Sequence, residues 1–202
     1  MFFDSRRAAA ATALALVFPL TACFPEAPSL HPLFHAAEPL PAAAIEGEWV
    51  VEGKPDERLQ IESTGDFYEL RLFDGDCARA AASPECPIRL SARFGRLSGE
   101  RFMDFTARDA PLSLPVHHFS RVRLGAGRLE IAPVNQEWLS QAITSGQIAL
   151  AHEVRDGSHG QILITASTED LQRVIGAWAF APEAFDEPTL YVRPGAAGGE
   201  TN

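Results

Sequence analysis

Residues 88–94 read Ile-Arg-Leu-Ser-Ala-Arg-Phe, and this stretch decides the fold class of the chain. Its apolar residues occupy every second position, with arginine and serine between them. A period of two predicts a β-strand with one buried and one solvated face. Residues 67–72 repeat the pattern, with Tyr68, Leu70 and Leu72 on the apolar face. We therefore expect the chain to build its core mainly from strands.

Similar runs recur along the chain, and turn residues such as Gly125-Ala126-Gly127 separate them. They cover residues 45–51, 58–62, 101–106, 116–124, 128–132, 148–154, 161–165 and 189–193. Short strands at this close spacing predict a mainly β fold, an antiparallel meander of about eight to ten strands that forms a closed or nearly closed barrel. Two short helices interrupt it, one capped by Asn135 and one by Ser167, and we expect both to pack on the sheet.

The first and last strands of this meander carry a recognisable pair of residues. Gly47-Glu48-Trp49 lies in the first strand, and Arg193 ends the last one. The arrangement resembles the lipocalin pattern, in which a Gly-x-Trp motif on the first strand packs against an arginine near the end of the barrel. The resemblance implies a lipocalin-like barrel in which Gly47, Trp49 and Arg193 serve structural closure. The two inserted helices depart from a simple eight-stranded lipocalin barrel.

The amino terminus carries an export signal. Arg6 and Arg7 precede the uncharged stretch 8–20, which is shorter than the roughly 20 residues that a membrane-spanning helix needs. The stretch ends in Leu-Thr-Ala-Cys at residues 20–23, which resembles the bacterial lipobox. The resemblance implies that residues 1–22 are a cleaved signal peptide and that Cys23 is acylated. The alternative is an ordinary secretory signal in which Cys23 stands by chance.

The lipobox resemblance also implies a location. Acyl chains on Cys23 would hold the mature chain on a membrane of the bacterial cell envelope. In enteric bacteria an aspartate after the cysteine favours retention in the inner membrane, whereas this chain has Phe24 there. The expected location is the periplasmic face of the outer membrane.

The composition divides the mature chain into three parts. Residues 23–44 contain five prolines and little periodicity, so we expect a semi-extended linker that spans up to about 65 Å at about 3.1 Å per residue. Residues 45–194 are expected to form a single barrel-like domain. Residues 195–202 are small and polar, and are expected to form a disordered tail.

Two cysteines remain after Cys23. Cys77 and Cys86 lie nine positions apart, and in an oxidising periplasm we expect them to form a disulfide. Loss of loop entropy in the unfolded chain would make it worth about 2.7 kcal/mol. No Cys-x-x-Cys motif is present, so the expected role is structural. The alternative is two unpaired thiols.

Charge and motifs exclude several function classes. The formal net charge of −10 repels phosphate backbones, which argues against nucleic acid as a partner. The sequence contains no Gly-x-Ser-x-Gly, no His-Glu-x-x-His, no P-loop and no dinucleotide fingerprint. We therefore assign no catalytic residue, no metal ligand and no cofactor.

One group of polar residues remains a candidate pocket. Strand alternation places His118 and Ser120 on the inward face of their strand, and His152 on that of another; Asp104 could join them if it shares the face of Phe102. Such a group could bind a metal ion or act as an acid/base pair. The alternative is that each residue is a hydrogen-bonded core residue, and nothing in the sequence shows that they meet.

The function expected from these observations is binding. A lipid-anchored periplasmic lipoprotein with a barrel-like domain could bind a small apolar ligand in the barrel mouth, or an envelope component. A second hypothesis is an accessory or structural lipoprotein that docks on an envelope protein complex. A third is a hydrolase or metalloenzyme that uses His118 and His152. A barrel interior lined by large side chains with no void would favour docking over ligand binding, and a cavity into which both histidines point would favour the enzyme.

Overall fold

The structure is a computed structural model that describes residues 28–38, 40–75, 77, 86–108, 114–154 and 162–195. The expected signal peptide, the acylation site Cys23 and residues 196–202 of the expected tail lie outside the described residues. None of the helices within these ranges combines the length and the apolar character needed to cross a membrane.

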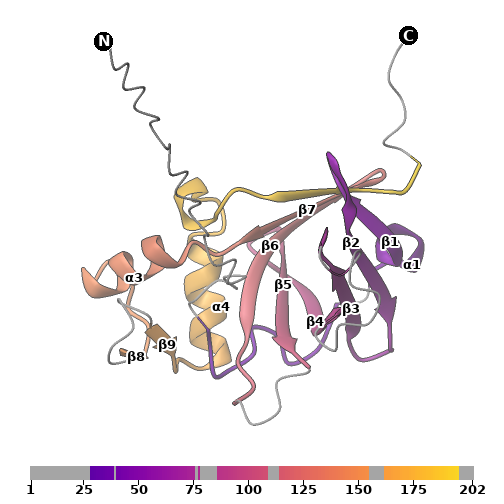
Figure 1. The fold of residues 1–202 in the computed structure, drawn as a ribbon. Helices are drawn as coiled ribbons and strands as arrows, with labels where there is room; N and C mark the ends of the chain where they lie inside the picture. Colours follow the sequence, from indigo (N-terminus) through magenta and orange to yellow (C-terminus); the bar gives the residue numbers. More distant parts are fainter. Residues whose placement is uncertain are drawn as a thin grey trace, which may run out of the picture.

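Eight antiparallel strands close into a barrel, as the sequence predicts (Figure 1). They are β1 (Gly47–Val51), β2 (Lys54–Ser63), β3 (Tyr68–Phe73), β4 (Ile88–Leu97), β5 (Glu100–Ala107), β6 (His118–Gly125), β7 (Arg128–Pro133) and β10 (Thr189–Val192). The order around the barrel is β1-β10-β7-β6-β5-β4-β3-β2, so every barrel strand is paired on both sides. Closure leaves none of these eight strands with a free edge for an added strand.

A long insertion separates β7 from the closing strand β10. It contains α3 (Gln136–Thr144), the two-stranded sheet of β8 (His152–Val154) and β9 (Ile162–Ile164), α4 (Thr168–Ala177) and the 3₁₀ turn η1 (Pro182–Ala184). The predicted caps are present, because Asn135 Oδ1 accepts the Trp138 amide at 2.8 Å and Ser167 Oγ accepts the Asp170 amide at 3.2 Å. These elements lie on one side of the barrel, opposite the short helix α1 (Ala42–Ile45) (Figure 1).

The molecule has two apolar cores, one inside the barrel and one outside it. Strand β5 belongs to both, since Met103 and Phe105 point into the barrel while Phe102 points outward under the insertion. The inner core consists of Leu40, Ile45, Trp49, Leu59, Ile61, Tyr68, Leu70, Leu90, Ala92, Phe94, Met103, Phe105, Val122, Leu129 and Tyr191. The outer core joins the apolar faces of α3, α4 and β9 to the barrel wall.

The prediction of a semi-extended linker at residues 23–44 is wrong for the part of this range that the structure describes. The N-terminal segment, residues 28–38, packs on the domain: Ser29 exchanges two backbone hydrogen bonds with His117, and Leu30 N–H donates to Ile164. Leu33 is fully buried in the outer core, and farther along the chain Leu40 is buried in the inner one. The folded domain therefore includes residues 28–38 and does not begin at Ile45.

Candidate functional site

Trp49 and Arg193 meet where the first and last strands of the barrel pair. The guanidinium carbon of Arg193 lies 3.9 Å from the centroid of the Trp49 ring. Arg193 Nη1 donates to the carbonyl of Glu46 at 2.7 Å, and Nη2 donates to that of Ala44 at 3.3 Å. Burial lowers the pKa of Arg193, but a guanidinium still carries its charge at neutral pH. The arrangement fastens α1 to the barrel and offers no reactive group.

Gly47 fits this closure because it has no side chain. Its φ angle is +100°, a conformation that side chains disfavour, and an added Cβ would lie 3.1 Å from Arg193 Nη1. The three residues Gly47, Trp49 and Arg193 therefore form one structural unit in this fold.

The polar residues of the candidate pocket do not come together. His118 stacks on Phe105 inside the barrel, with the ring centroids 5.5 Å apart, and Ser120 faces Met103 on the same inner face. Asp104 alternates with these inward residues, so it points out of the barrel on the face of Phe102. His152 lies in the separate β8–β9 sheet, where its Nδ1–H donates to the Leu150 carbonyl at 2.8 Å. Of the two possibilities left open by the sequence, the structure does not show the pocket shared by His118 and His152.

Asp104 pairs with His117 and not with the other residues of the candidate pocket. Its Oδ1 accepts a 2.7 Å hydrogen bond from Nδ1 of His117, the neighbour of His118, and its Oδ2 accepts the Leu33 amide at 2.8 Å. The Asp104 side chain is 1% exposed. A buried carboxylate is stable only where such donors satisfy it. Asp104 therefore holds the N-terminal segment against the barrel wall.

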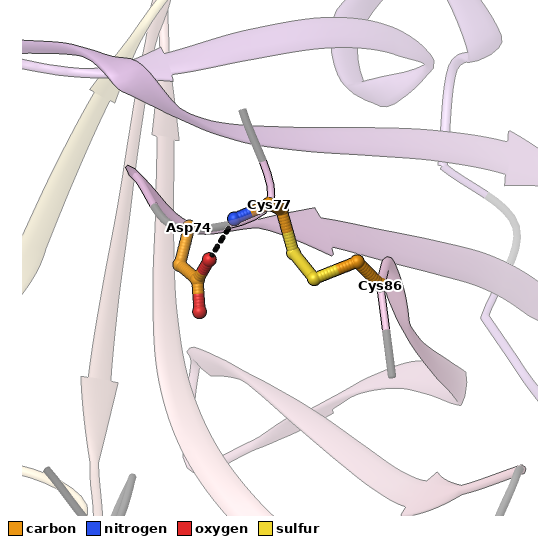
Figure 2. Close-up of side chains that lie close together, drawn as sticks. All are labelled: Asp74, Cys77 and Cys86. Carbon is orange, nitrogen blue, oxygen red and sulfur yellow. Dashed lines mark hydrogen bonds between the residues drawn. A yellow bond between two sulfur atoms is a disulfide. The ribbon is translucent and has the colours of Figure 1, made fainter. Parts of the chain in front are cut away.

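The predicted disulfide between Cys77 and Cys86 is confirmed, and Figure 2 shows it beside Asp74. Asp74 Oδ1 accepts the Cys77 amide at 2.7 Å. Potential ligand atoms of these three residues lie within 4.8 Å of one another. The disulfide removes the thiolates that a metal ion would need, so this group is a structural staple between β3 and β4.

A cavity of about 430 Å³ lies on the outer side of the barrel, between α3, α4 and the chain that follows α3. We call it the outer groove. Its lining is mostly apolar and includes two of the three tryptophans of the chain. The lining residues are Trp138, Gln147, Ile148, Ala149, Arg173, Val174, Ala177 and Trp178.

A chain of aromatic contacts connects the outer groove to the barrel wall. Trp138 meets Trp178 edge to face at 5.3 Å, Trp178 lies 5.6 Å from Phe185, and Phe185 lies 6.1 Å from Phe102. Arg121 stacks on Phe185 at 4.1 Å. Aromatic side chains fixed by neighbours on several sides lose little further freedom when a ligand binds. The groove therefore has a preorganised aromatic wall.

Two polar groups border this wall, and a third is buried inside it. Arg173 is 64% exposed and donates to Asp170 at 2.6 Å, and this hydrogen bond lowers the pKa of the Asp170 carboxyl. Gln147 adds an amide. Trp178 Nε1 is buried and finds no acceptor within the part of the chain that the structure describes. All three groups can donate hydrogen bonds, and the arginine and tryptophan side chains have no hydrogen-bond acceptor.

The sequence did not single out the outer groove. Both helices were expected to bury their apolar faces on the sheet, and Leu139, Ala142, Leu171 and Val174 do so. The sequence contained one further signal, because each helical region has a tryptophan, Trp138 in the first and Trp178 in the second. A helix does not need a tryptophan to bury an apolar face on a sheet. That signal acquires a meaning only when the helices are placed side by side.

Comparisons with protein families, with curated proteins and with solved structures found no match to this chain. Its function is therefore inferred from its own residues and geometry.

Proposed function

We propose that this chain is a lipid-anchored lipoprotein of the periplasm that acts by binding, and that the outer groove is its binding site. The lipobox-like residues 20–23 support the anchor, and Phe24 supports the outer membrane. The anchor and the domain together make a binding module held at a membrane surface.

The size and the lining of the outer groove are the observations that carry this proposal. The groove offers about 430 Å³ beside exposed helix surface. Pockets for small molecules range from about 300 to about 1,000 Å³ and are mostly apolar with a few polar groups. The groove fits this description, which supports a ligand site on the outside of the barrel.

Native mass spectrometry can test this proposal on the mature chain, residues 24–202, exported without its acylated cysteine. We expect the protein from a periplasm to carry a small molecule. Ala177→Phe should fill the groove and abolish that binding, because Ala177 is an exposed helical residue that lines the cavity. Ala43→Phe is the matched control, since Ala43 is also an exposed helical alanine and lies in α1, across the barrel. Retention of the molecule by the Ala177→Phe variant would place the binding site elsewhere.

Docking on an envelope protein complex is the second candidate function. Phe180 is 64% exposed and follows Trp178 by two residues, so it adds apolar surface near the groove. A photoreactive amino acid at position 180 of the full lipoprotein should then form one defined adduct in intact cells. The same group at position 43 serves as the control. An empty groove together with a specific adduct at position 180 would favour docking over small-molecule binding.

A further inference from the structure

We infer that the outer groove binds an amphipathic carboxylate, with the apolar part against the tryptophans and the carboxylate on Arg173. This inference rests on the binding function proposed above and adds the chemical class of the ligand.

The lining of the groove supplies the first step. Ile148 and Val174 are nearly buried, and Ala149 and Ala177 are small, so the groove has an apolar floor with room above it. Trp138 adds a partly exposed indole. Aliphatic and aromatic groups gain free energy when such a floor covers their apolar surface. A fully polar ligand would leave this gain unused.

Charge supplies the second step. Of the eight lining residues that the structure describes, Arg173 alone carries a formal charge. Its guanidinium has five N–H donors, and the hydrogen bond to Asp170 occupies one of them while fixing the side chain near α4. A guanidinium binds a carboxylate through two parallel hydrogen bonds. An amphipathic cation would meet the like charge of Arg173 in this lining.

The amide of Gln147 supplies the third step. Gln147 lines the same cavity as Arg173, and its N–H groups can donate to a ligand oxygen. Trp178 contributes apolar surface, because its Nε1 is buried in the wall of the groove. The amide and guanidinium donors thus select the same head group, and the apolar floor selects an amphipath.

The closing experiment compares two probes of equal chain length, decanoate and decyltrimethylammonium, below their micelle concentrations. Calorimetry on the mature chain, residues 24–202, should show binding of decanoate and no comparable binding of the cation. Decanoate should also shift the indole N–H resonance of Trp178, which a Trp178→Phe sample identifies. Equal affinities for the two probes would overturn the inference about charge and leave the binding function standing.

Three variants locate the interaction. Arg173→Gln should weaken decanoate binding at least about tenfold, because a hydrogen bond to a charged group is lost. Arg128→Gln is the matched control, since Arg128 is also an exposed arginine with an acidic partner, Glu52 at 2.8 Å, and lies on the barrel. Ala177→Phe should abolish binding with an unchanged melting temperature.

An Arg173→Gln variant that binds decanoate as well as the parent chain would refute the assigned role of Arg173. A groove that carries a native ligand and binds neither probe would overturn the ligand class alone.

Discussion

Arg193 lies over the indole of Trp49, and this contact joins the last strand of the barrel to the first. The two residues are 144 positions apart in the sequence, so the pair forms only when the chain has closed on itself. The carbonyls of Glu46 and Ala44 accept from the same guanidinium, which ties α1 to the seam.

We predict that Arg193→Ala lowers the free energy of unfolding by about 2–4 kcal/mol, because the cation–π contact and the carbonyl hydrogen bonds are lost together. Arg193→Lys should recover only a minor part, since an ammonium cannot reproduce the planar fork. Urea denaturation measures both values. Arg128→Ala should cost less than about 1 kcal/mol, as an exposed ion pair does. Full stability of the Arg193→Lys variant would contradict the role of the fork.

Gly95 should tolerate no side chain while Phe34 is in place. A Cβ at Gly95 would lie 2.5 Å from the Phe34 ring, so Gly95→Ala must displace the N-terminal segment. We expect a loss of about 1–3 kcal/mol, typical of overpacking. In a Phe34→Ala background the same substitution should cost much less. A double-mutant cycle by urea denaturation gives this coupling, and simple additivity would contradict the contact.

Asp104→Asn should loosen the N-terminal segment before it affects the barrel. The amide cannot replace the charge-assisted bonds to His117 and Leu33, so we expect a loss of about 2–3 kcal/mol. Hydrogen exchange should rise first at residues 29–34. Asp56→Asn is the control, because Asp56 is exposed on β2. Uniform exchange across the whole barrel would show instead that Asp104 acts on global stability.

Because of Tyr191, we expect the free energy of unfolding to fall at alkaline pH. Burial, followed by the charge of Glu57, raises the pKa of Tyr191 to about 12, whereas an unfolded tyrosine ionises near about 10. The favourable contribution of the neutral phenol is therefore full below about pH 10, and it is lost as the pH rises from about 10 to about 12. Two pKa units correspond to about 2.7 kcal/mol. Denaturation series in this range should show the decline, and Tyr191→Phe should remove it.

The strands were predictable because a period of two is a local property of the sequence. Each of the ten predicted runs overlaps a strand of the structure, and the caps Asn135 and Ser167 begin the two predicted helices. The N-terminal segment was not predictable, because its prolines suppress any period and its burial comes from isolated residues such as Leu33 and Phe34. The burial of such residues becomes apparent only when the surface against which they pack is known.

The candidate pocket shows a second limit of local patterns. Alternation placed His118 inward and Asp104 with Phe102, and the structure has both in those positions. The pattern could not reveal that the two faces of β5 belong to different cores, since a strand covered on both sides buries both of its faces. The outer groove depends on the relative position of two helices that 23 residues separate in sequence, and no local pattern encodes that.

The docked N-terminal segment has a consequence for how the anchor works. Only residues 24–27 separate Cys23 from Pro28, where the described domain begins. Five Cα steps at about 3.6 Å each span at most about 18 Å, far less than the expected 65 Å linker. If Cys23 is acylated as proposed, the barrel cannot sample the depth of the periplasm. Its encounters take place within a thin layer along one leaflet, where confinement raises the effective concentration of any partner that shares the same surface.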